Sequence, residues 1–236
     1  HALGSDIIMV FDECTPYPAT REQARESMEL SMRWAGRCKE AHGEHTSALF
    51  GIVQGGMYSD LREESLAGLV ELGFDGYALG GLSVGEPKNE MRDVIQHCGA
   101  LLPAEKPRYL MGVGTPQDIV YAVTQGIDMF DCVMPTRNAR HGMLFTSEGI
   151  INIKNQKWEK DYSPLDPMGI SYVDLKYSKA YLRHLIKSKE HLAVQIASIH
   201  NLAFYLWLVK EARVQIKAGT FVAWKNKMIP KLGNRL

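Results

Sequence analysis

The sequence predicts an α/β fold with parallel strands, followed by a helical C-terminal region. Short apolar runs alternate with helical segments over the first two-thirds of the chain, which is the order of βαβ units. Polar or glycine residues follow each run, as they do where active sites form at the carboxyl ends of parallel strands, in closed barrels and in open sheets alike. The last third changes to long, mostly basic helical segments.

Five apolar runs predict the strands, and the segments between them predict helices. The first run, IIMVFD, is continuous and ends in an acid, as a buried parallel strand does. Thr20 and Gln23 form a capping box that starts a helix running to about Cys38. Thr115 and Pro116 supply an N-cap and a proline at the first helical position. The predicted strands are 7–12, 48–53, 76–79, 108–113 and 127–134, and further helices are expected at 60–72 and 88–101.

The C-terminal third is predicted as a small separate region. Residues 141–163 are expected to form a short antiparallel piece and a polar loop, and helices are expected over 178–188, 190–218 and about 220–228. The predicted domains are therefore 1–150, the strand-and-helix part, and 151–236, the helical subdomain.

Composition and cysteine usage are those of an ordinary soluble protein. The chain has 236 residues, 45% of them hydrophobic and 23% charged. No run of 18 apolar residues occurs, so no membrane span is expected, and the first residues do not have the pattern of a signal peptide. The four cysteines form no CxxC pair. We expect a reduced, cytoplasmic protein.

Charge is divided unevenly along the chain. Residues 1–149 carry 12 Lys and Arg against 21 Asp and Glu, whereas residues 150–236 carry 15 against 6. A basic region of this kind is able to face a polyanion such as RNA. A solvated, lysine-rich helical surface explains the same pattern equally well.

The segment that indicates chemistry is DCVMPTRNAR, residues 131–140. Asp131 ends a predicted strand, and a carboxylate there can attack an anomeric carbon to form a covalent glycosyl-enzyme intermediate. Arg137 and Arg140, in the proline-containing loop that follows, can bind phosphates or bases. The alternative is an acid that caps a loop, with arginines paired to nearby acids. Neither GxGxxG nor GxxxxGK[ST] follows a strand, so no dinucleotide or P-loop nucleotide site is indicated.

Five linked motifs resemble those of bacterial tRNA-guanine transglycosylases, in the same order and with the same spacing. The similarity continues through YSKAYLRHL and IHNLAFYL and so covers nearly the whole chain. The family exchanges the guanine at the first anticodon position of tRNA for a 7-deazaguanine queuosine precursor. The motifs are SDIIMVFDECTPYP, ALFGIVQGG, GFDGYALGGLSVGE, RYLMGVGTPQDIV and DMFDCVMPTRNARHG.

The resemblance implies a role for each matching residue. Asp131 is expected to be the nucleophile that attacks the ribose carbon, Asp12 to bind the amidine-like edge of the base, and Gln54 to bind its carbonyl. The remaining base-pocket residues implied are Gly80, Gly81, Leu82, Met111 and Gly112. The residues implied in tRNA binding are Gly112, Val113, Gly114, Thr115, Pro116, Gln117, Asp118, Thr136, Arg137, Asn138, Ala139 and Arg140.

The resemblance implies a closed (β/α)8 barrel, of which this chain carries about five strands. We therefore expect a partial TIM barrel with two open sheet edges. The strands that precede SDIIMVFDE in the family carry a DSGG-type motif whose Asp is a general acid/base, and no equivalent occurs here. The chain is then a fragment, half of a two-chain enzyme, or a degenerate relative. The family's homodimer, a partner chain that completes the barrel, and association through strand edges are the assemblies considered.

The family's structural zinc site is expected to be lost. Its C-x-C-x-x-C motif follows a Leu-Asp-Pro stretch, but the cysteine positions here are Gly169, Ser171 and Asp174, and only His200 remains of the ligands. A structural zinc needs four N or S ligands. We expect no metal and no other cofactor, His200 packed or at the surface of a helix, a loosened 164–200 region, and a small apolar replacement core. The residues expected in that core are Tyr172, Leu175 and Tyr177.

Three functions are considered. The first is a glycosyltransferase that acts on tRNA and 7-aminomethyl-7-deazaguanine or guanine through a covalent Asp131–ribose intermediate. The second is a catalytically incomplete RNA- or partner-binding subunit, which the missing acid/base favours. The third is a small-molecule α/β-barrel enzyme of another class, which has no need of Arg137, Arg140 or the basic C-terminal third.

Overall fold

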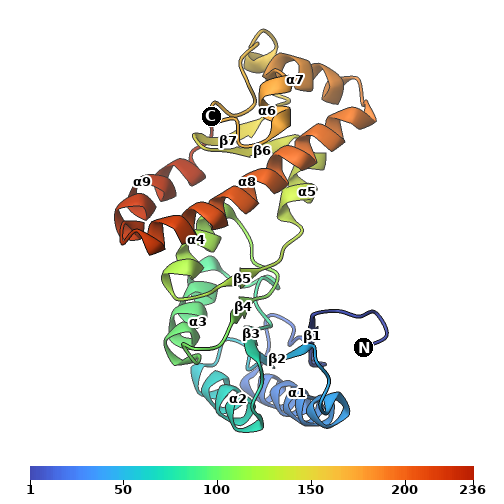
Figure 1. Cartoon of the computed structure of the whole chain (residues 1–236), viewed down its shortest axis with the longest axis vertical. Coiled ribbons are helices and arrows are strands. Elements are labelled where there is room, and N and C mark those ends of the chain that lie inside the picture. Colours follow the sequence, from blue (N-terminus) through green and yellow to red (C-terminus); the bar gives the residue numbers. More distant parts are fainter. The chain divides into compact units, whose positions relative to one another are not determined.

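The computed structural model describes all residues, 1–236, and they form two compact units (Figure 1). Unit 1 comprises His1–Val113 and Tyr121–Cys132, and unit 2 comprises Gly114–Val120 and Val133–Leu236. Helix α4 (Pro116–Thr124) contributes residues to both. The predicted domain boundary at residue 150 stays a prediction.

Unit 1 is built on a curled sheet of five parallel strands in the order β1-β2-β3-β4-β5. Each strand pairs with the next one along the chain and a helix lies in each of the four connections, so the predicted βαβ arrangement and partial barrel are confirmed. The two outer strands, β1 and β5, pair on one side only. The elements are β1 (Ile7–Met9), α1 (Arg21–His42), β2 (Ala48–Val53), α2 (Ser59–Leu72), β3 (Gly76–Leu79), α3 (Lys88–Leu101), β4 (Arg108–Leu110) and β5 (Met129–Phe130).

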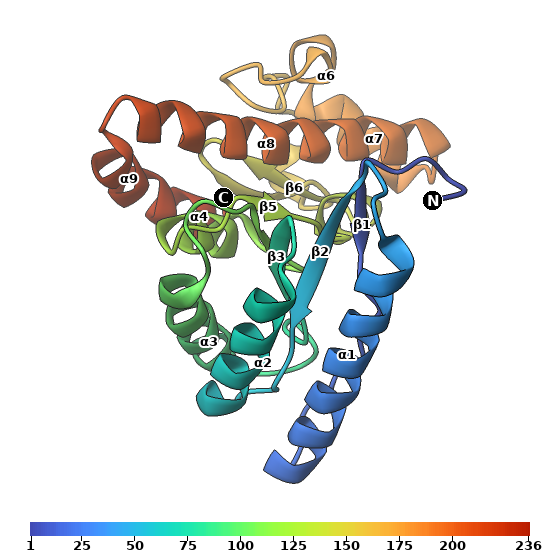
Figure 2. The same ribbon diagram turned by 60° about the horizontal axis from the view of Figure 1, so that its bottom comes forward.

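Helices α1, α2 and α3 lie side by side on one face of this sheet (Figure 2). The Thr20 hydroxyl accepts from Gln23 N and the Gln23 side chain accepts from Thr20 N, so the predicted capping box is confirmed. The central strands β2 and β3 are buried on both faces, as their continuous apolar sequence requires. Burial of these strands against the helices makes the core of unit 1.

Two predictions about local structure are corrected. Strands β1, β4 and β5 are shorter than the apolar runs that predicted them, because only single backbone bonds, Val10 N to Phe50 O and Met111 N to Leu79 O, continue past the ends of β1 and β4, and β5 is reduced to Met129–Phe130. The segment after Asp131 is a helix, α5 (Met134–Arg140), and not a loop. Pro135 lies in its first turn, where a missing N–H costs nothing.

Unit 2 packs helices around the antiparallel hairpin β6 (Met143–Thr146) and β7 (Gly149–Asn152). The predicted antiparallel piece is therefore confirmed. Its centre is α8 (His191–Lys217), which contacts α5, α6, α7, α9 and β6 and lies across the hairpin in Figure 1. The other elements are the 3₁₀ turn η1 (Gln156–Trp158), α6 (Tyr172–Lys176), α7 (Lys179–Lys187) and α9 (Phe221–Gly233).

Helix α8 is long and apolar enough to cross a membrane by length and composition alone. It is, however, the core helix of unit 2, because His200, Asn201, Phe204 and Leu208 are all buried along it. Burial within the unit accounts for its apolar character.

Candidate active site

The residues predicted from strand ends lie along one edge of the sheet in unit 1. Asp12, Gln54, Gly80, Met111 and Asp131 follow β1, β2, β3, β4 and β5 in turn. All five strands are parallel, so their carboxyl ends meet at the same edge. Two hydrogen-bonded clusters form there.

The first cluster joins Asp12, Gln54 and Gly80. Gln54 is fully buried, and its Nε2 donates to Asp12 Oδ2 at 2.7 Å. A methyl group on Gly80 would lie 2.7 Å from Gln54 Nε2 and 3.4 Å from Asp12 Oδ2. Only glycine therefore leaves the amide and the carboxylate room to meet.

Gly81 is required both for its conformation and for its size. Its φ is +64°, in the left-handed region, and a methyl group there would overlap Gln54 Oε1. We expect Gly81→Ala to cost about 1 kcal/mol in backbone strain and to displace Gln54, lowering by roughly tenfold or more the affinity for guanine, the ligand that the family resemblance implies. Calorimetric titration with guanine and thermal unfolding measure the two effects.

The matched control is Gly73→Ala. Gly73 has a similar φ of +72° at the end of α2, but a methyl group there meets nothing within 4 Å. The control should lose stability and keep its guanine affinity. Equal affinity losses in both variants would mean that crowding at Gln54 is irrelevant.

The second cluster holds Asp131, which is exposed. Its Oδ1 accepts from Tyr109 Oη at 2.7 Å and from Gly112 N at 2.8 Å, whereas Oδ2 has no such partner. Burial, together with the hydrogen bond to Asp131, raises the pKa of the Tyr109 phenol well above its usual range. Tyr109 therefore stays protonated as a donor, one carboxylate oxygen is fixed, and the other is available to react.

Leu82 and Gly112 bring the two clusters near one another. Met111 N donates to Leu79 O, which continues the β3–β4 ladder past the strand ends. A methyl group on Gly112 would lie 4.0 Å from Leu82 O. The predicted base-pocket residues of unit 1 thus form one continuous edge, from Asp12 to Asp131.

The predicted tRNA-binding segments after Val113 belong to unit 2, and α8 holds both of them. Tyr205 Oη donates to Gly114 O at 3.1 Å, and Asn201 Nδ2 donates to Pro135 O at 2.9 Å. Asn201 and Tyr205 are four residues apart and so lie on one face of α8.

Exposure divides the predicted tRNA-binding residues. Gly112, Arg137 and Arg140 are exposed. Neither arginine forms an ion pair, so the alternative interpretation, in which both arginines pair with nearby acids, does not apply. The half-buried residues are Gly114, Thr115, Gln117, Thr136 and Asn138, and the buried ones are Val113, Pro116, Asp118 and Ala139. The buried residues are able to position the segments rather than to touch RNA.

Three residues at this edge, Tyr109, Glu86 and Arg62, are not among those predicted from the sequence. Tyr109, which donates to Asp131, lies two residues before the predicted pocket residue Met111. The Glu86 carboxylate accepts from Ser83 N and Val84 N. Arg62 is buried behind Gln54. Only Arg62 gives a sequence signal. It falls among Leu61, Ser65 and other buried positions of α2, where an apolar residue is expected.

Comparison with known proteins assigns the family. A family model described as queuine tRNA-ribosyltransferase matches residues 1–234. The chain belongs to this family. Queuine tRNA-ribosyltransferases of Francisella tularensis subsp. tularensis (strain WY96-3418) and subsp. novicida (strain U112) are 59% and 58% identical to it over 227 residues. These matches cover 96% of this chain and 62% of each relative's length. Membership in a tRNA glycosyltransferase family disagrees with the third function considered from the sequence, a small-molecule α/β-barrel enzyme of another class.

The zinc site implied by the resemblance to tRNA-guanine transglycosylases does not fit the residues of this chain. His200 Nδ1 lies 2.6 Å from Asp174 Oδ1 and its Nε2 lies 2.9 Å from Phe145 O. Nε2 must donate, because a carbonyl has no hydrogen. Asp174 Oδ2 also accepts from Ser171 N, whose hydroxyl caps α6. Both ring nitrogens are occupied, Gly169 has no side chain, and two ligands are too few for a structural zinc.

Burial corrects the expected apolar replacement core. Tyr172 and Leu175 are 66% and 72% exposed, so that part of the prediction is wrong. Val173 and Leu165 are buried instead, beside the fully buried Asp174 and the 1% exposed His200. Of the two alternatives expected for His200, packed or at the surface of a helix, the structure shows the packed one, and the pair Asp174–His200 occupies positions at which the resemblance implies metal ligands.

Three histidines of unit 1 lie close together, and their geometry does not favour a metal site. Their ligand atoms lie within 4.8 Å of one another, but His1 and His45 stack at 3.7 Å and His1 Nε2 lies 3.3 Å from His42 Nδ1, so stacking and hydrogen bonding already account for the group. His45 Nδ1 accepts from Ser47 N, and its Nε2 therefore carries the hydrogen of the neutral ring.

Proposed function

We propose that this chain supplies the nucleophile and the base pocket of a cytoplasmic tRNA-guanine transglycosylase. The substrates would be a tRNA with guanine at the first anticodon position and 7-aminomethyl-7-deazaguanine or guanine. The supporting observation is the anchored Asp131 carboxylate, with Oδ1 held by two donors and Oδ2 free, on the same sheet edge as Asp12 and Gln54.

The proposed reaction is a double displacement at the ribose C1′ carbon. Asp131 Oδ2 attacks C1′, the C1′–N9 bond breaks, and guanine leaves and takes up a proton. The incoming base then attacks C1′ through its own ring nitrogen, loses a proton and displaces the carboxylate. Tyr109 and Gly112 N orient Asp131, and Asp12 and Gln54 orient the base. We propose that an acid/base in another part of the protein gives a proton to the leaving guanine and takes one from the incoming base.

The proposed RNA contacts are electrostatic. Arg137 and Arg140 are three residues apart on one side of α5, exposed and free of acidic partners. Guanidinium groups in that state suit phosphate oxygens of the anticodon loop. In the sequence they follow Asp131 by six and nine residues.

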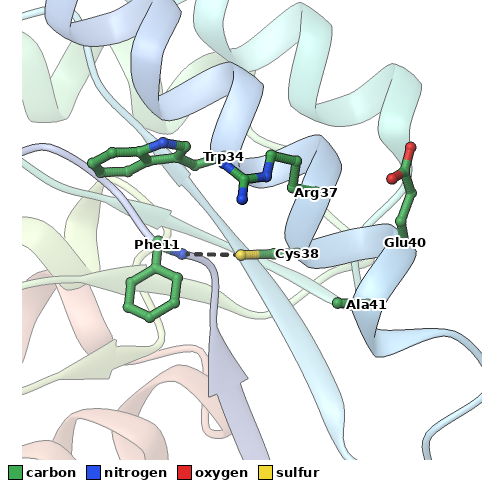
Figure 3. A pocket seen from close by; sticks show the side chains of 6 residues that line it. All are labelled: Phe11, Trp34, Arg37, Cys38, Glu40 and Ala41. Atoms are coloured by element: carbon green, nitrogen blue, oxygen red, sulfur yellow. Dashed lines mark hydrogen bonds between the residues drawn. The ribbon is translucent and has the colours of Figure 1, made fainter.

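The open edge at β1 suits further barrel strands. A cavity of about 860 Å³ lies there, lined by Phe11, Trp34, Arg37, Cys38, Glu40 and Ala41 (Figure 3). Phe11 is 76% exposed, and its N–H donates to Cys38 Sγ and not to another strand. The chain spans 62% of the length of its relatives. We propose that barrel strands outside this sequence, from the same protein or from a partner, cover this edge; the homodimer remains a further proposal.

Base exchange tests the proposed function. The whole protein in which this sequence occurs is incubated with labelled guanine and a tRNA that has guanine at the first anticodon position. Label should enter that tRNA and should not enter a tRNA with adenine there. Binding of the tRNA without exchange would favour the catalytically incomplete RNA-binding subunit.

Metal analysis tests the proposed absence of a structural zinc. The purified protein should hold well below one zinc per chain, and chelator should leave the unfolding temperature unchanged, because metal removal destabilises only a protein that folds around the metal. The same analysis on a His42→Ala variant removes any contribution from the three-histidine group. One zinc per chain in that variant would contradict the proposal.

A further inference from the structure

Arg62 is a buried cation without a carboxylate partner. It is the fourth residue of α2, is 1% exposed and forms no ion pair. Burial lowers the pKa of Arg62, although a guanidinium remains charged at physiological pH. A positive charge in the first turn of a helix is also disfavoured by the helix dipole. An unpaired buried charge is costly, so this position needs an explanation beyond packing.

Three backbone carbonyls account for most of its donors. Nε donates to Gly56 O at 2.9 Å, and Nη1 donates to Val53 O and Gly80 O, both at 2.8 Å. These bonds tie the end of β2 to the end of β3, directly behind the predicted base pocket. Nη2 has no hydrogen-bond partner.

Gln54 has the complementary unpaired group. Its Nε2 donates to Asp12, but its buried Oε1 has no partner. Oε1 and Arg62 Nη2 face the same space at Gly81, where a methyl group would overlap the first and lie 3.6 Å from the second. Two charges therefore act on one amide: the Asp12 carboxylate at its nitrogen end and the Arg62 guanidinium on the side of its oxygen.

Reversing the Gln54 amide would be unfavourable at both ends. Oε1 would then meet the Asp12 carboxylate, and the NH₂ group would meet the guanidinium. In the observed orientation Nε2 carries two hydrogens and gives one to Asp12, so the second is available to a carbonyl of a bound base. The amide is thereby fixed as a donor.

We propose that Arg62 is a positioning residue that holds the Gln54 amide as a hydrogen-bond donor and so makes the pocket select bases with a carbonyl at that edge. The inference rests on the proposed function, because it assumes that this pocket binds a guanine-type base. Arg62 acts through Gln54 and does not touch the base.

The test compares guanine with 2,6-diaminopurine, in which an amino group replaces the carbonyl. Binding of each free base to the whole protein is measured by calorimetry for the unsubstituted protein, Arg62→Met and Gln54→Ala. Arg62→Met should lower the preference for guanine by about tenfold or more, since the amide is then free to present its oxygen to the amino group. In the Gln54→Ala background the same substitution should leave the preference unchanged.

A role confined to stability gives a different result. Arg62→Met would then weaken both bases equally and lower the unfolding temperature, with the preference for guanine intact, and this would overturn the proposal. If Arg62→Met does not fold, Arg62→Lys carries the test. Lysine keeps the cation but cannot hold three carbonyls, so both bases should bind more weakly while guanine stays preferred; loss of that preference would overturn the proposal. Failure of label exchange by the unsubstituted protein would instead count against the proposed function.

Discussion

Asp131→Asn is expected to reduce base exchange by roughly 10³-fold or more, because an amide cannot form the covalent bond to the ribose. The variant should fold normally. The asparagine oxygen can still accept from Tyr109 Oη and Gly112 N, the two donors that fix Oδ1. Exchange of labelled guanine into tRNA measures the rate, and a denaturing gel of protein incubated with tRNA detects the covalent species.

Tyr109→Phe is the matched control for this variant. It removes one of the two donors to Oδ1 but keeps the carboxylate and the Gly112 bond. A hydrogen bond to a charged group contributes about 1.5–3 kcal/mol, so a loss of at least tenfold is expected, smaller than that of Asp131→Asn. A covalent species in Asp131→Asn at the normal level would mean that another residue is the nucleophile.

His200→Ala is expected to destabilise unit 2 by about 3–5 kcal/mol, since it leaves the Asp174 carboxylate buried without its partner. Asp174→Val combined with His200→Phe should cost much less, because an apolar pair of similar volume removes both buried polar groups together. Urea unfolding followed by tryptophan fluorescence reports mainly on this unit, which holds Trp158, Trp207 and Trp224 of the four tryptophans.

The exposed His191 at the start of α8 provides the control. His191→Ala removes a histidine from the same helix and should change the free energy of unfolding by less than about 0.5 kcal/mol. If the double variant were as unstable as His200→Ala alone, the pair would not be the unit that stabilises this interior.

Local patterns in the sequence were sufficient to predict the parallel sheet. The bounds of β2, β3 and α3 agree with the predicted ones, because β2 and β3 are short apolar segments and α3 has its buried residues at helical spacing after Pro87, so each signal is contained in the local sequence. The order of polar residues after the strands followed from the same patterns. The placement of Asp12, Gln54 and Asp131 on one edge is then a consequence of parallel strands.

Features that depend on distant residues were not predictable in this way. Helix α5 has only seven residues, too few for a periodic signal, and it packs against α8, where Asn201 holds the Pro135 carbonyl. The apolar core expected from Tyr172 and Leu175 failed for a similar reason, because the interior is filled by Val173 and by Asp174, which pairs with the distant His200. No pattern near residue 135 or 174 contains this information.

The segment Gly114–Asp118 is synthesised long before the residues that anchor it. The Gly114 carbonyl accepts a hydrogen bond from Tyr205, which is synthesised 91 residues later. The Gln117 side chain donates to the Ile229 carbonyl, which is synthesised 112 residues later. At about 5–20 residues per second, a ribosome needs roughly 5–20 s to supply these partners. The stretch is therefore among the last parts of the protein to become ordered, and a nascent chain released before Ile229 would leave it only partly anchored.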